Sequence, residues 1–485
     1  MVYQGRPVEP IRRTSESPWL RRRSRREVLR LGAVIVAGGA IAPLLAACAG
    51  PSGSAAAPVA PSAGGSPAPS AAPTTHALTG PITVVMGGGG PSTEPALQKV
   101  YDDFKAQNPA IEWDIRAIPG FGAEWDRLAR ASLESGEPVG LVMIDGLFVR
   151  AWARDGLLAD LSADPALARV LARVPGRFHL AGPGETVTRA FPLALSQGVQ
   201  TTGMYYNKAM LDRAGLVAPR TITDLKALVK PLAAVGAAPL TFCSGEISFN
   251  SMLVTWLLPM IAGRTGDPLA FVERTVKGEV RYDSPEWIEA FGAIADLRTS
   301  GVLLDGSGAT DYPTMQALFL QGKAAMAYNG SWLLAQLQAG TPTVSFDLHV
   351  APLPHVDGTS KAHSILSWGG VAMPAGSAGN RDSVDAFLEY ASRPEVDQAV
   401  VEGLQSYSPI PESNVAIHNA VAREFLPMFD DAITPLNWLW EPEIEAEVNN
   451  QVQALVKGDT DPASVGKAIE AVAEELRSSG RGYYS

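Results

Sequence analysis

The sequence predicts an α/β protein of two lobes, preceded by a long segment that is not part of the fold. Strand-like and helix-like segments alternate from residue 81 onward, which favours a sheet with a substantial parallel component. Roughly 400 residues follow the leading segment, too many for one typical hydrophobic core. Hydrophobic residues make up 46% of the chain and charged residues 18%, which fits a well-buried globular body.

The first 47 residues have the pattern of an export signal. Nine arginines and no lysine precede an apolar run of 17 residues, Leu31–Ala47, which is shorter than the roughly 20 residues of a spanning helix. Arg25-Arg26 resembles a twin-arginine signal, and the sequence Leu-Ala-Ala-Cys ending at Cys48 resembles a bacterial lipobox. We expect residues 1–47 to be cleaved and lipid on Cys48 to anchor the chain outside the cytoplasm. The alternative is an ordinary membrane anchor in which Cys48 has no role.

Residues 48–79 predict a disordered linker. They are almost entirely Ala, Pro, Ser and Gly and offer little to bury in a core. At roughly 3.1–3.6 Å per residue, such a segment can hold a folded domain away from a membrane surface. Regular structure is expected to begin near Pro81.

The charge of the folded part limits the kinds of partner it can bind, and its cysteine content limits its disulfide bonds. Residues 1–47 hold nine of the 39 basic and three of the 50 acidic residues, so the rest of the chain has a formal net charge of −17. This excess argues against nucleic acid, which selects basic grooves, and against docking on anionic lipid. Beyond Cys48 the chain has only Cys243, so an intramolecular disulfide is excluded there. The apolar surroundings of Cys243 predict a buried, inert thiol.

The first half of the expected fold alternates strand and helix. A glycine-rich loop, 87–92, follows the first strand, and the third strand ends before Asp145. We expect strands at Ile82–Met86, Ile111–Ile115 and Leu141–Ile144, and helices over 97–104, 124–135 and around 149–152.

The second half is richer in helix. An apolar run at 238–243 predicts a further strand, and the chain shows no internal repeat of fixed period. We expect helices at 223–235, 249–261, 285–300, 312–321, 381–391 and 394–402.

The sequence motifs that could mark a reactive site indicate no cofactor, metal or catalytic centre. The glycines at 87–90 lie between a strand and a helix, but the Lys-Ser/Thr of a phosphate-binding loop is missing. His349, His355 and His363 share no helical face and have no cysteines nearby, which disfavours a metal site. No Gly-x-Ser-x-Gly motif occurs. Carboxylates are abundant, so a glycosidase pair stays open as an alternative.

Tryptophan is the residue type that stands out. Aromatic faces stack on the apolar faces of sugars, while carboxylates and amides bind the hydroxyls. Trp332 and Trp368 lie beside glycine and polar residues, which favours a ligand-facing role, whereas Trp113, Trp152 and Trp287 favour the core. Nine tryptophans follow the leader: Trp113, Trp125, Trp152, Trp256, Trp287, Trp332, Trp368, Trp438 and Trp440.

From about Pro81 to the C-terminus, the chain resembles the family 1 extracellular solute-binding proteins. These are the sugar receptors of ABC importers, and maltodextrin-binding protein is a relative. The resemblance is specific because its motifs occur in order. They are Gly156–Leu161, Phe191–Ala194, Gly203–Lys208, Ala214–Leu216, Phe319–Met326, Gly330–Trp332, Trp368–Val371 and Ala386–Leu388.

The resemblance implies a two-lobe periplasmic-binding-protein fold of type II, with ligand held between the lobes. The chain would cross between lobes near 197–202, 361–367 and 408–412. Residues 80–199 with 364–410 would form the N-terminal lobe, and residues 200–363 with 411–485 the C-terminal lobe.

The resemblance also implies the ligand-facing positions. In one respect the chain departs from the family pattern: Val139-Gly140 follows Pro138 where an Asp is usual, which weakens the alignment next to Asp145. The positions are Gly88, Gly89, Ser92, Asp145, Gln200, Glu246, Trp332, Trp368, Gly369 and, more weakly, Trp440.

Together these features predict a monomeric, lipid-anchored receptor that captures a sugar or oligosaccharide by lobe closure and delivers it to an ABC permease. No cofactor and no nucleic acid are expected. Two alternatives remain open. One is a receptor for another solute, such as a polyol, a phosphodiester or a metal complex. The other is an exported carbohydrate-active enzyme.

Overall fold

A computed structural model gives the fold of the chain from residue 78 onward. It describes residues 78–87, 95–118, 122–136, 138–178, 181–182, 185–186, 188–196, 198–339, 344–358, 366–376 and 380–482. The predicted signal peptide, Cys48 and nearly all of the predicted linker lie outside these residues. Within them, no helix is both long and apolar enough to cross a membrane.

The N-terminal part of the sheet is mostly parallel. Strand β1 (Ile82–Gly87) pairs in parallel with β2 (Trp113–Ile118) on one side and with β3 (Leu141–Asp145) on the other. The first five residues of β1 are buried, as expected for a strand covered on both faces. Strand β11 (Leu366–Ala372) returns antiparallel to β3 and also pairs with the short β6 (Ala190–Phe191).

The C-terminal part continues the same sheet through one long strand. Strand β7 (Val199–Asn207) pairs at its start with β11 and further along with β9 (Ala324–Gly330) and β10 (Leu348–Ala351). Strand β8 (Ala238–Thr241) is parallel to β9. The main path of the nine-stranded sheet is therefore β2-β1-β3-β11-β7-β9-β8. Strand β7 pairs with strands of both parts, and β7 and β11 lie at two of the three predicted crossings. A separate pair, β4 (Ala181–Gly182) and β5 (Glu185–Thr186), forms its own small sheet.

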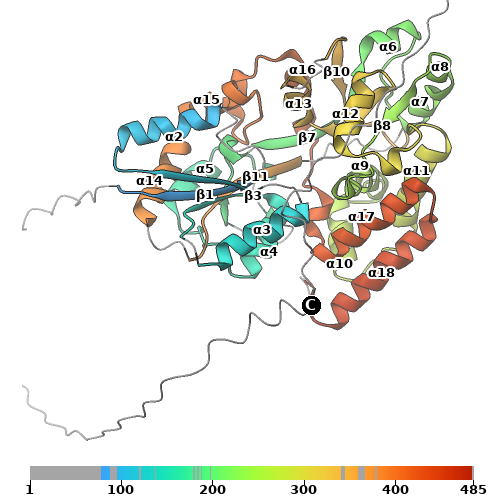
Figure 1. The fold of residues 1–485 in the computed structure, drawn as a ribbon. Coiled ribbons are helices and arrows are strands. Elements are labelled where there is room, and N and C mark those ends of the chain that lie inside the picture. Colours follow the sequence, from blue (N-terminus) through green and yellow to red (C-terminus); the bar gives the residue numbers. More distant parts are fainter. Residues whose placement is uncertain are drawn as a thin grey trace, which may run out of the picture. The chain divides into compact units, whose positions relative to one another are not determined.

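Helices flank both parts of the sheet. In the N-terminal part, α2 and α15 lie on one side of β1 and β3, and α3 and α4 lie on the other (Figure 1). These helices are α2 (Pro95–Gln107), α3 (Gly122–Glu134), α4 (Gly146–Arg154), α5 (Pro165–Leu171), α14 (Arg381–Ala391) and α15 (Pro394–Leu404). In the C-terminal part they are α6 (Lys208–Arg213), α7 (Ile222–Ala227), α8 (Val229–Ala233), α9 (Ser251–Ala262), α10 (Pro268–Val276), α11 (Pro285–Thr299), α12 (Tyr312–Leu320), α13 (Leu333–Ala339), α16 (Ala420–Phe425), α17 (Pro442–Lys457) and α18 (Pro462–Ser478).

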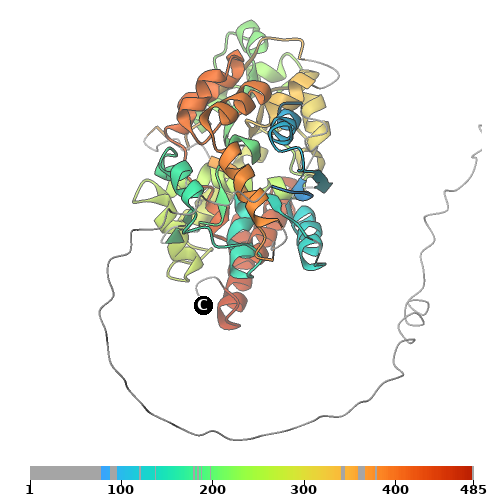
Figure 2. The ribbon, with the colours of Figure 1, turned by 90° about the vertical axis from the view of Figure 1, so that its left-hand side faces the viewer.

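The buried apolar side chains form two clusters. One surrounds the N-terminal part of the sheet and extends along β7 to α12, α13 and α16. The other fills the space between the C-terminal strands and α9, α11, α17 and α18. Figure 2 views the molecule from the side on which the N-terminal part lies. The first cluster includes Val199 and Tyr205, near the two ends of β7, so this strand is packed along most of its length. The lobe boundaries stay a prediction.

Most expected helices are found within a few residues, with one break. The predicted helix 223–235 is two helices, α7 and α8, and it begins one residue early, at Ile222, because Thr221 caps it in a capping box with Asp224. Pro231 explains the break, since its ring clashes with the carbonyl four residues earlier, at Ala227, where α7 ends. The helices α10, α17 and α18 were not predicted, although each begins with a proline in its first turn.

Candidate functional site

The register of the sheet places several predicted ligand-facing residues on a line that crosses four neighbouring strands. Asp145 ends β3 opposite Gly369 of β11. The residue before Gly369, Trp368, lies opposite Val199, and Gln200 lies opposite Ser367. Two residues further along β7, Thr202 pairs with Gly330, and Trp332 follows Gly330 in the next turn. Positions more than 180 residues apart in the sequence thus form a continuous path across β3, β11, β7 and β9.

Asp145 begins this path. Its Oδ1 accepts a hydrogen bond of 2.9 Å from the backbone N–H of Leu147 and so caps α4. The side chain is exposed to solvent, yet dense protein surrounds it and raises the pKa of the carboxyl to about 6, with the Leu147 bond opposing this rise. Among the described residues, Oδ2 has no partner and remains available for a ligand.

Gly369 is required by the backbone. A Cβ at this position would lie 2.5 Å from the carbonyl oxygen of Ser196 and 3.2 Å from that of Ile144. The strand therefore approaches both segments too closely for any side chain. Trp368 belongs to β11 by its backbone, but its side chain lies outside the described residues, as do Gly88, Gly89 and Ser92.

The crossing at Gln200 is fixed by its neighbours. Gly198 has φ +60°, and a Cβ there would lie 1.9 Å from the Tyr407 carbonyl oxygen. The same oxygen accepts a hydrogen bond of 2.8 Å from the Val199 N–H. Gln200 is half-buried at the start of β7, so its amide is held at the point where the chain passes between the two parts of the sheet.

Trp332 belongs to an aromatic group with Phe249 and Tyr312. Its ring meets that of Phe249 edge-on at 6.4 Å between centroids, and Phe249 and Tyr312 are 4.9 Å apart. The indole also lies over Gly330, where a Cβ would be 1.8 Å from the ring. All three side chains are half-buried. The group leaves part of an aromatic surface open beside the crossing.

Glu246 lies on the same loop as Phe249. The loop 243–250 turns through hydrogen bonds from the Glu246 N–H to Cys243 and from the Phe249 N–H to Glu246, both of 3.0 Å. Glu246 is half-buried, and its neighbour Ile247 is 44% exposed. The loop thus presents a carboxylate and an apolar side chain next to the aromatic group.

Trp440 lies elsewhere. It is 3% exposed, belongs to the C-terminal core and packs 6.0 Å from Trp287. A ring enclosed in this way offers no free face for stacking, so Trp440 is not retained among the proposed ligand contacts. Its neighbour Trp438 was not among the predicted ligand-facing positions, although the sequence places it, like Trp440, at an element end beside polar residues. A Cβ on Gly146 would lie 2.2 Å from the Trp438 ring, which places Trp438 against the start of α4, beside Asp145.

The short turn Leu436–Leu439 contains Trp438 and ends just before Trp440. Its short 3₁₀ helix directs Leu436 and Leu439 into the core and leaves Trp438 half-buried at the N-terminal part of the molecule. The sequence signal that could have distinguished Trp438 from Trp440 is the leucine on either side of Asn437-Trp438, because both leucines are buried in the core. Trp438 adds an aromatic ring from the C-terminal part next to the carboxylate of Asp145.

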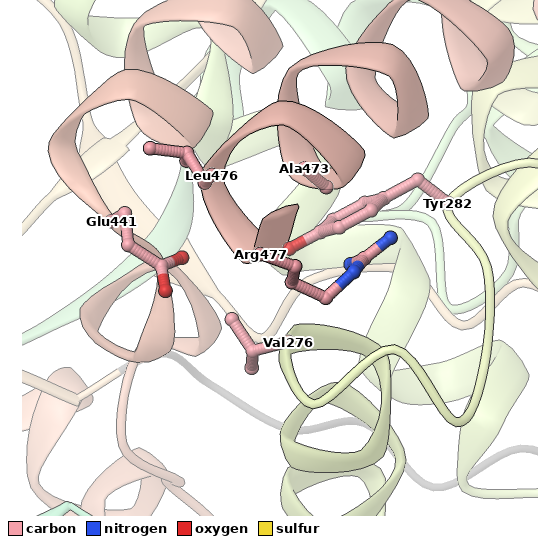
Figure 3. A pocket seen from close by; sticks show the side chains of 6 residues that line it. All are labelled: Val276, Tyr282, Glu441, Ala473, Leu476 and Arg477. Atoms are coloured by element: carbon pink, nitrogen blue, oxygen red, sulfur yellow. The ribbon is translucent and has the colours of Figure 1, made fainter. Parts of the chain in front are cut away.

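Other groups in the described residues do not compete with this path. No cluster of three or more His, Cys, Asp or Glu residues there could hold a metal ion. Cys243 is buried, and burial raises the pKa of its thiol, which disfavours a reactive thiolate. A cavity beside α18 has a free volume of about 10 Å³ (Figure 3), on the order of one water molecule.

Comparisons with known proteins agree on the fold and the family. The model of the bacterial extracellular solute-binding proteins matches residues 90–398. A probable sugar-binding periplasmic protein of Brucella suis is 24% identical over 247 residues, or 50% of this chain and 56% of that protein. A putative binding protein of Brucella abortus is 21% identical over 79% of this chain and 90% of its own length. The chain thus spans little more than half the length of the first of these relatives.

Solved structures give the same architecture over most of the chain. The GacH receptor of Streptomyces glaucescens, solved unliganded and with acarbose, has a TM-score of 0.67 at 22% identity and covers 82% of this chain and 98% of its own. A chitin oligosaccharide binding protein has a TM-score of 0.70 at 17% identity, over 82% of this chain and 99% of its own. The predicted type II fold, with two lobes, is confirmed. The chain belongs to the bacterial extracellular solute-binding protein family.

Proposed function

We propose that this protein binds a sugar or oligosaccharide between its lobes and delivers it to the permease of an ABC importer. The observation that carries the proposal is the continuous path from Asp145 to Trp332 along the crossing strands. It combines a solvent-exposed carboxylate with an open aromatic surface. Sugars need both, because their ring faces are apolar and their edges carry hydroxyls.

Each part of the path has a role in this proposal. The Trp332 ring, supported by Phe249, stacks on one sugar ring. Asp145 and Glu246 accept hydrogen bonds from hydroxyls, and Gln200 supplies an amide at the crossing. A ligand without those hydroxyls leaves the polar groups unpaired, which costs about 1–3 kcal/mol for each buried group. Lobe closure around the crossings completes the enclosure of the ligand.

The named relatives support a carbohydrate. The Brucella suis protein is named as sugar-binding, GacH was solved with acarbose, and a structural relative from T. maritima, MalE3, was solved with maltose. These ligands belong to those proteins. They suggest α-linked glucose oligosaccharides as the first candidates here.

A binding screen tests the proposal. The mature protein, without its leader, is titrated with maltose, maltotriose, chitobiose, raffinose and a polyol by thermal shift and then by calorimetry. Ligand binding raises the unfolding temperature by mass action, so a sugar-specific shift supports the proposal. Analysis of the sugars after incubation separates receptor from enzyme, because a receptor returns its ligand intact. Hydrolysed product would contradict the proposed function.

We further propose that lipid on Cys48 holds this receptor at the outer side of the cell membrane, after export through the twin-arginine route. The arginine pair and the lipobox support this. Cys48→Ala should release the protein from the membrane fraction while leaving sugar binding unchanged. Substitution of Arg25 and Arg26 by lysine should retain it in the cytoplasm. The receptor is proposed to act as a monomer, which light scattering of the mature protein tests.

A further inference from the structure

We propose that Glu445 is a positioning residue that holds two separate ligand-facing segments, the loop 244–250 and the turn Leu436–Leu439, in one fixed arrangement. The first segment carries Glu246 and Phe249, and the second carries Trp438. The proposal rests on the proposed function for its ligand readout, but its structural part is tested without a ligand.

The contacts run from the turn through Glu445 to the loop. The Oε1 atom of Glu445 accepts hydrogen bonds from the side-chain amides of Asn437, at 3.4 Å, and of Asn449, at 3.1 Å. Asn449 in turn accepts a hydrogen bond of 2.8 Å from the backbone N–H of Ser251, the first residue of α9. Asn437 immediately precedes Trp438. One carboxyl group therefore joins the two segments, which are almost 190 residues apart in the sequence.

Further hydrogen bonds stabilise the loop and connect it to α17. The side-chain amide of Asn250 donates to the carbonyl oxygens of Ser244 and Ile247, at 3.1 and 3.0 Å. Gln453, two turns along α17 from Glu445, donates to the Ser244 carbonyl at 2.8 Å. One face of α17, which carries Glu445, Asn449 and Gln453 at intervals of four residues, thus supports the loop. Glu445 is the group on this face that also reaches the turn.

The surroundings of Glu445 are unusual for a carboxyl that only stabilises a helix. Its Oε2 is buried and has no hydrogen-bond partner among the described residues. Burial raises the pKa of Glu445 to about 7, outweighing the hydrogen bonds from Asn449 and Asn437. Such a group is a net cost to stability, which suggests that it is retained for the arrangement it imposes.

The opposite side of this junction has its own polar contacts. Glu441, one turn before Glu445, lines the small cavity with Tyr282 and Arg477 (Figure 3). Tyr282 is anchored through its backbone N–H, which donates to Glu470 at 2.8 Å. These contacts join α18 to the start of α17, whereas the hydrogen bonds given above for the described residues connect the turn with the loop through Glu445.

Hydrogen exchange tests the coupling directly on the mature protein. The probes are three backbone N–H groups: that of Ser251 donates to Asn449, that of Trp438 to Pro435 and that of Trp440 to Asn437. In Glu445→Ala we expect all three to exchange at least tenfold faster, in both segments together. Glu445→Gln keeps Oε1 and should retain near-native protection. Glu443→Gln, an exposed carboxyl on the same helix, is the matched control. Unchanged exchange in either segment of Glu445→Ala would overturn the proposal.

A double-mutant cycle separates positioning from general destabilisation. Asn437→Ala removes only the link to the turn and serves if Glu445→Ala does not fold. If Glu445 acts through Trp438, its substitution weakens sugar affinity about fivefold in the native background and by less than twofold in Trp438→Ala, because coupled residues are not additive. Equal effects in both backgrounds would contradict the role. A protein that binds no sugar would refute the proposed function, and the exchange result would still decide the coupling.

Discussion

The two sides of the proposed site meet a ligand with different chemistry. The N-terminal side offers a carboxylate and closely packed backbone, through Asp145, Gly146 and Gly369. The C-terminal side offers mainly aromatic surface, through Trp332, Phe249 and Tyr312, with the carboxylate of Glu246 beside it. Hydrogen bonds from the first side depend strongly on direction and distance, whereas stacking on the second tolerates small shifts. We infer that the N-terminal side sets which hydroxyls fit and the C-terminal side supplies most of the affinity.

The two sides differ in how they are built as well. Asp145 and Gly146 come directly after a buried parallel strand, where the helix start fixes the side chain. Trp332 follows a strand that is buried throughout, β9, but it is held by aromatic neighbours from two other segments. A local structure therefore positions the acid, and tertiary packing positions the ring.

Trp332→Ala should give the largest loss of affinity. It removes the proposed stacking surface and leaves Phe249 without its edge-on partner, so calorimetry with the best sugar of the screen should show at least tenfold weaker binding, ~1.4 kcal/mol or more. Trp332→Phe keeps an aromatic face and should recover part of the loss. An affinity unchanged in Trp332→Ala would refute the stacking role and remove the contrast between the two sides.

Asp145→Asn should have the next largest effect, and one that depends on pH. In the free protein the pKa of Asp145 is about 6, so the carboxylate, the stronger acceptor for hydroxyls, is formed above that pH and lost below it. Native affinity should therefore fall as the pH drops from 7.5 to 5. Asn keeps the cap on α4 but cannot titrate, so its profile should be flatter, with binding about fivefold weaker at pH 7.5.

The stability of Asp145→Asn provides the control. The raised pKa means that folding favours the protonated form, so the native protein loses stability as the pH rises from 3.8 through about 6. Asn removes this loss, and the unfolding temperature at pH 7.5 should not decrease. Because Glu445 titrates near pH 7, the profile of Glu445→Gln should be measured alongside it. If Asp145→Asn keeps the full native pH profile, another group carries the dependence.

Gly146→Ala should act more weakly, by disturbing the contact between the two sides. The added methyl group would lie 2.2 Å from the Trp438 ring, so the ring must move away from Asp145. We expect about threefold weaker binding and a lower unfolding temperature, since overpacking costs roughly 1–3 kcal/mol. Gly176→Ala meets nothing within 4 Å and is the matched control. Equal behaviour of the two variants would show that the Trp438 contact is unimportant.

Much of this arrangement could be predicted from the sequence. Apolar runs and glycine-rich turns located the strands at 82–86 and 141–144, and the ordered motifs indicated the family and the type II fold. The sheet register then put Asp145, Gln200 and Trp332 on a line across four neighbouring strands. The strand predictions succeed because apolar runs and the turns that flank them are local features. The antiparallel pairing of β3, β11, β7 and β9 brings the proposed site positions together, and their contact with a ligand stays a proposal.

The remainder depends on contacts between distant segments. Nothing in the sequence near Gly369 reveals that the Ser196 carbonyl occupies the place of its side chain. Pattern reasoning also missed the network from Asn437 through Glu445 to Ser251, because its members are polar residues on three separate elements. Trp438 and Trp440 look alike in sequence, and only the path of the turn between them distinguishes a ring at the site from a ring in the core.

Trp440→Phe tests that distinction and should have the smallest effect on binding. Trp440 is 3% exposed and packs against Trp287, and its indole N–H is buried without a partner among the described residues. Phe retains an aromatic ring in the core but leaves some space, so the unfolding temperature should fall while sugar affinity changes less than about twofold. Trp438→Phe should do the reverse, because Trp438 lies against α4 beside Asp145. A larger loss of affinity in Trp440→Phe than in Trp438→Phe would return Trp440 to the site and move the aromatic side deeper into the C-terminal lobe.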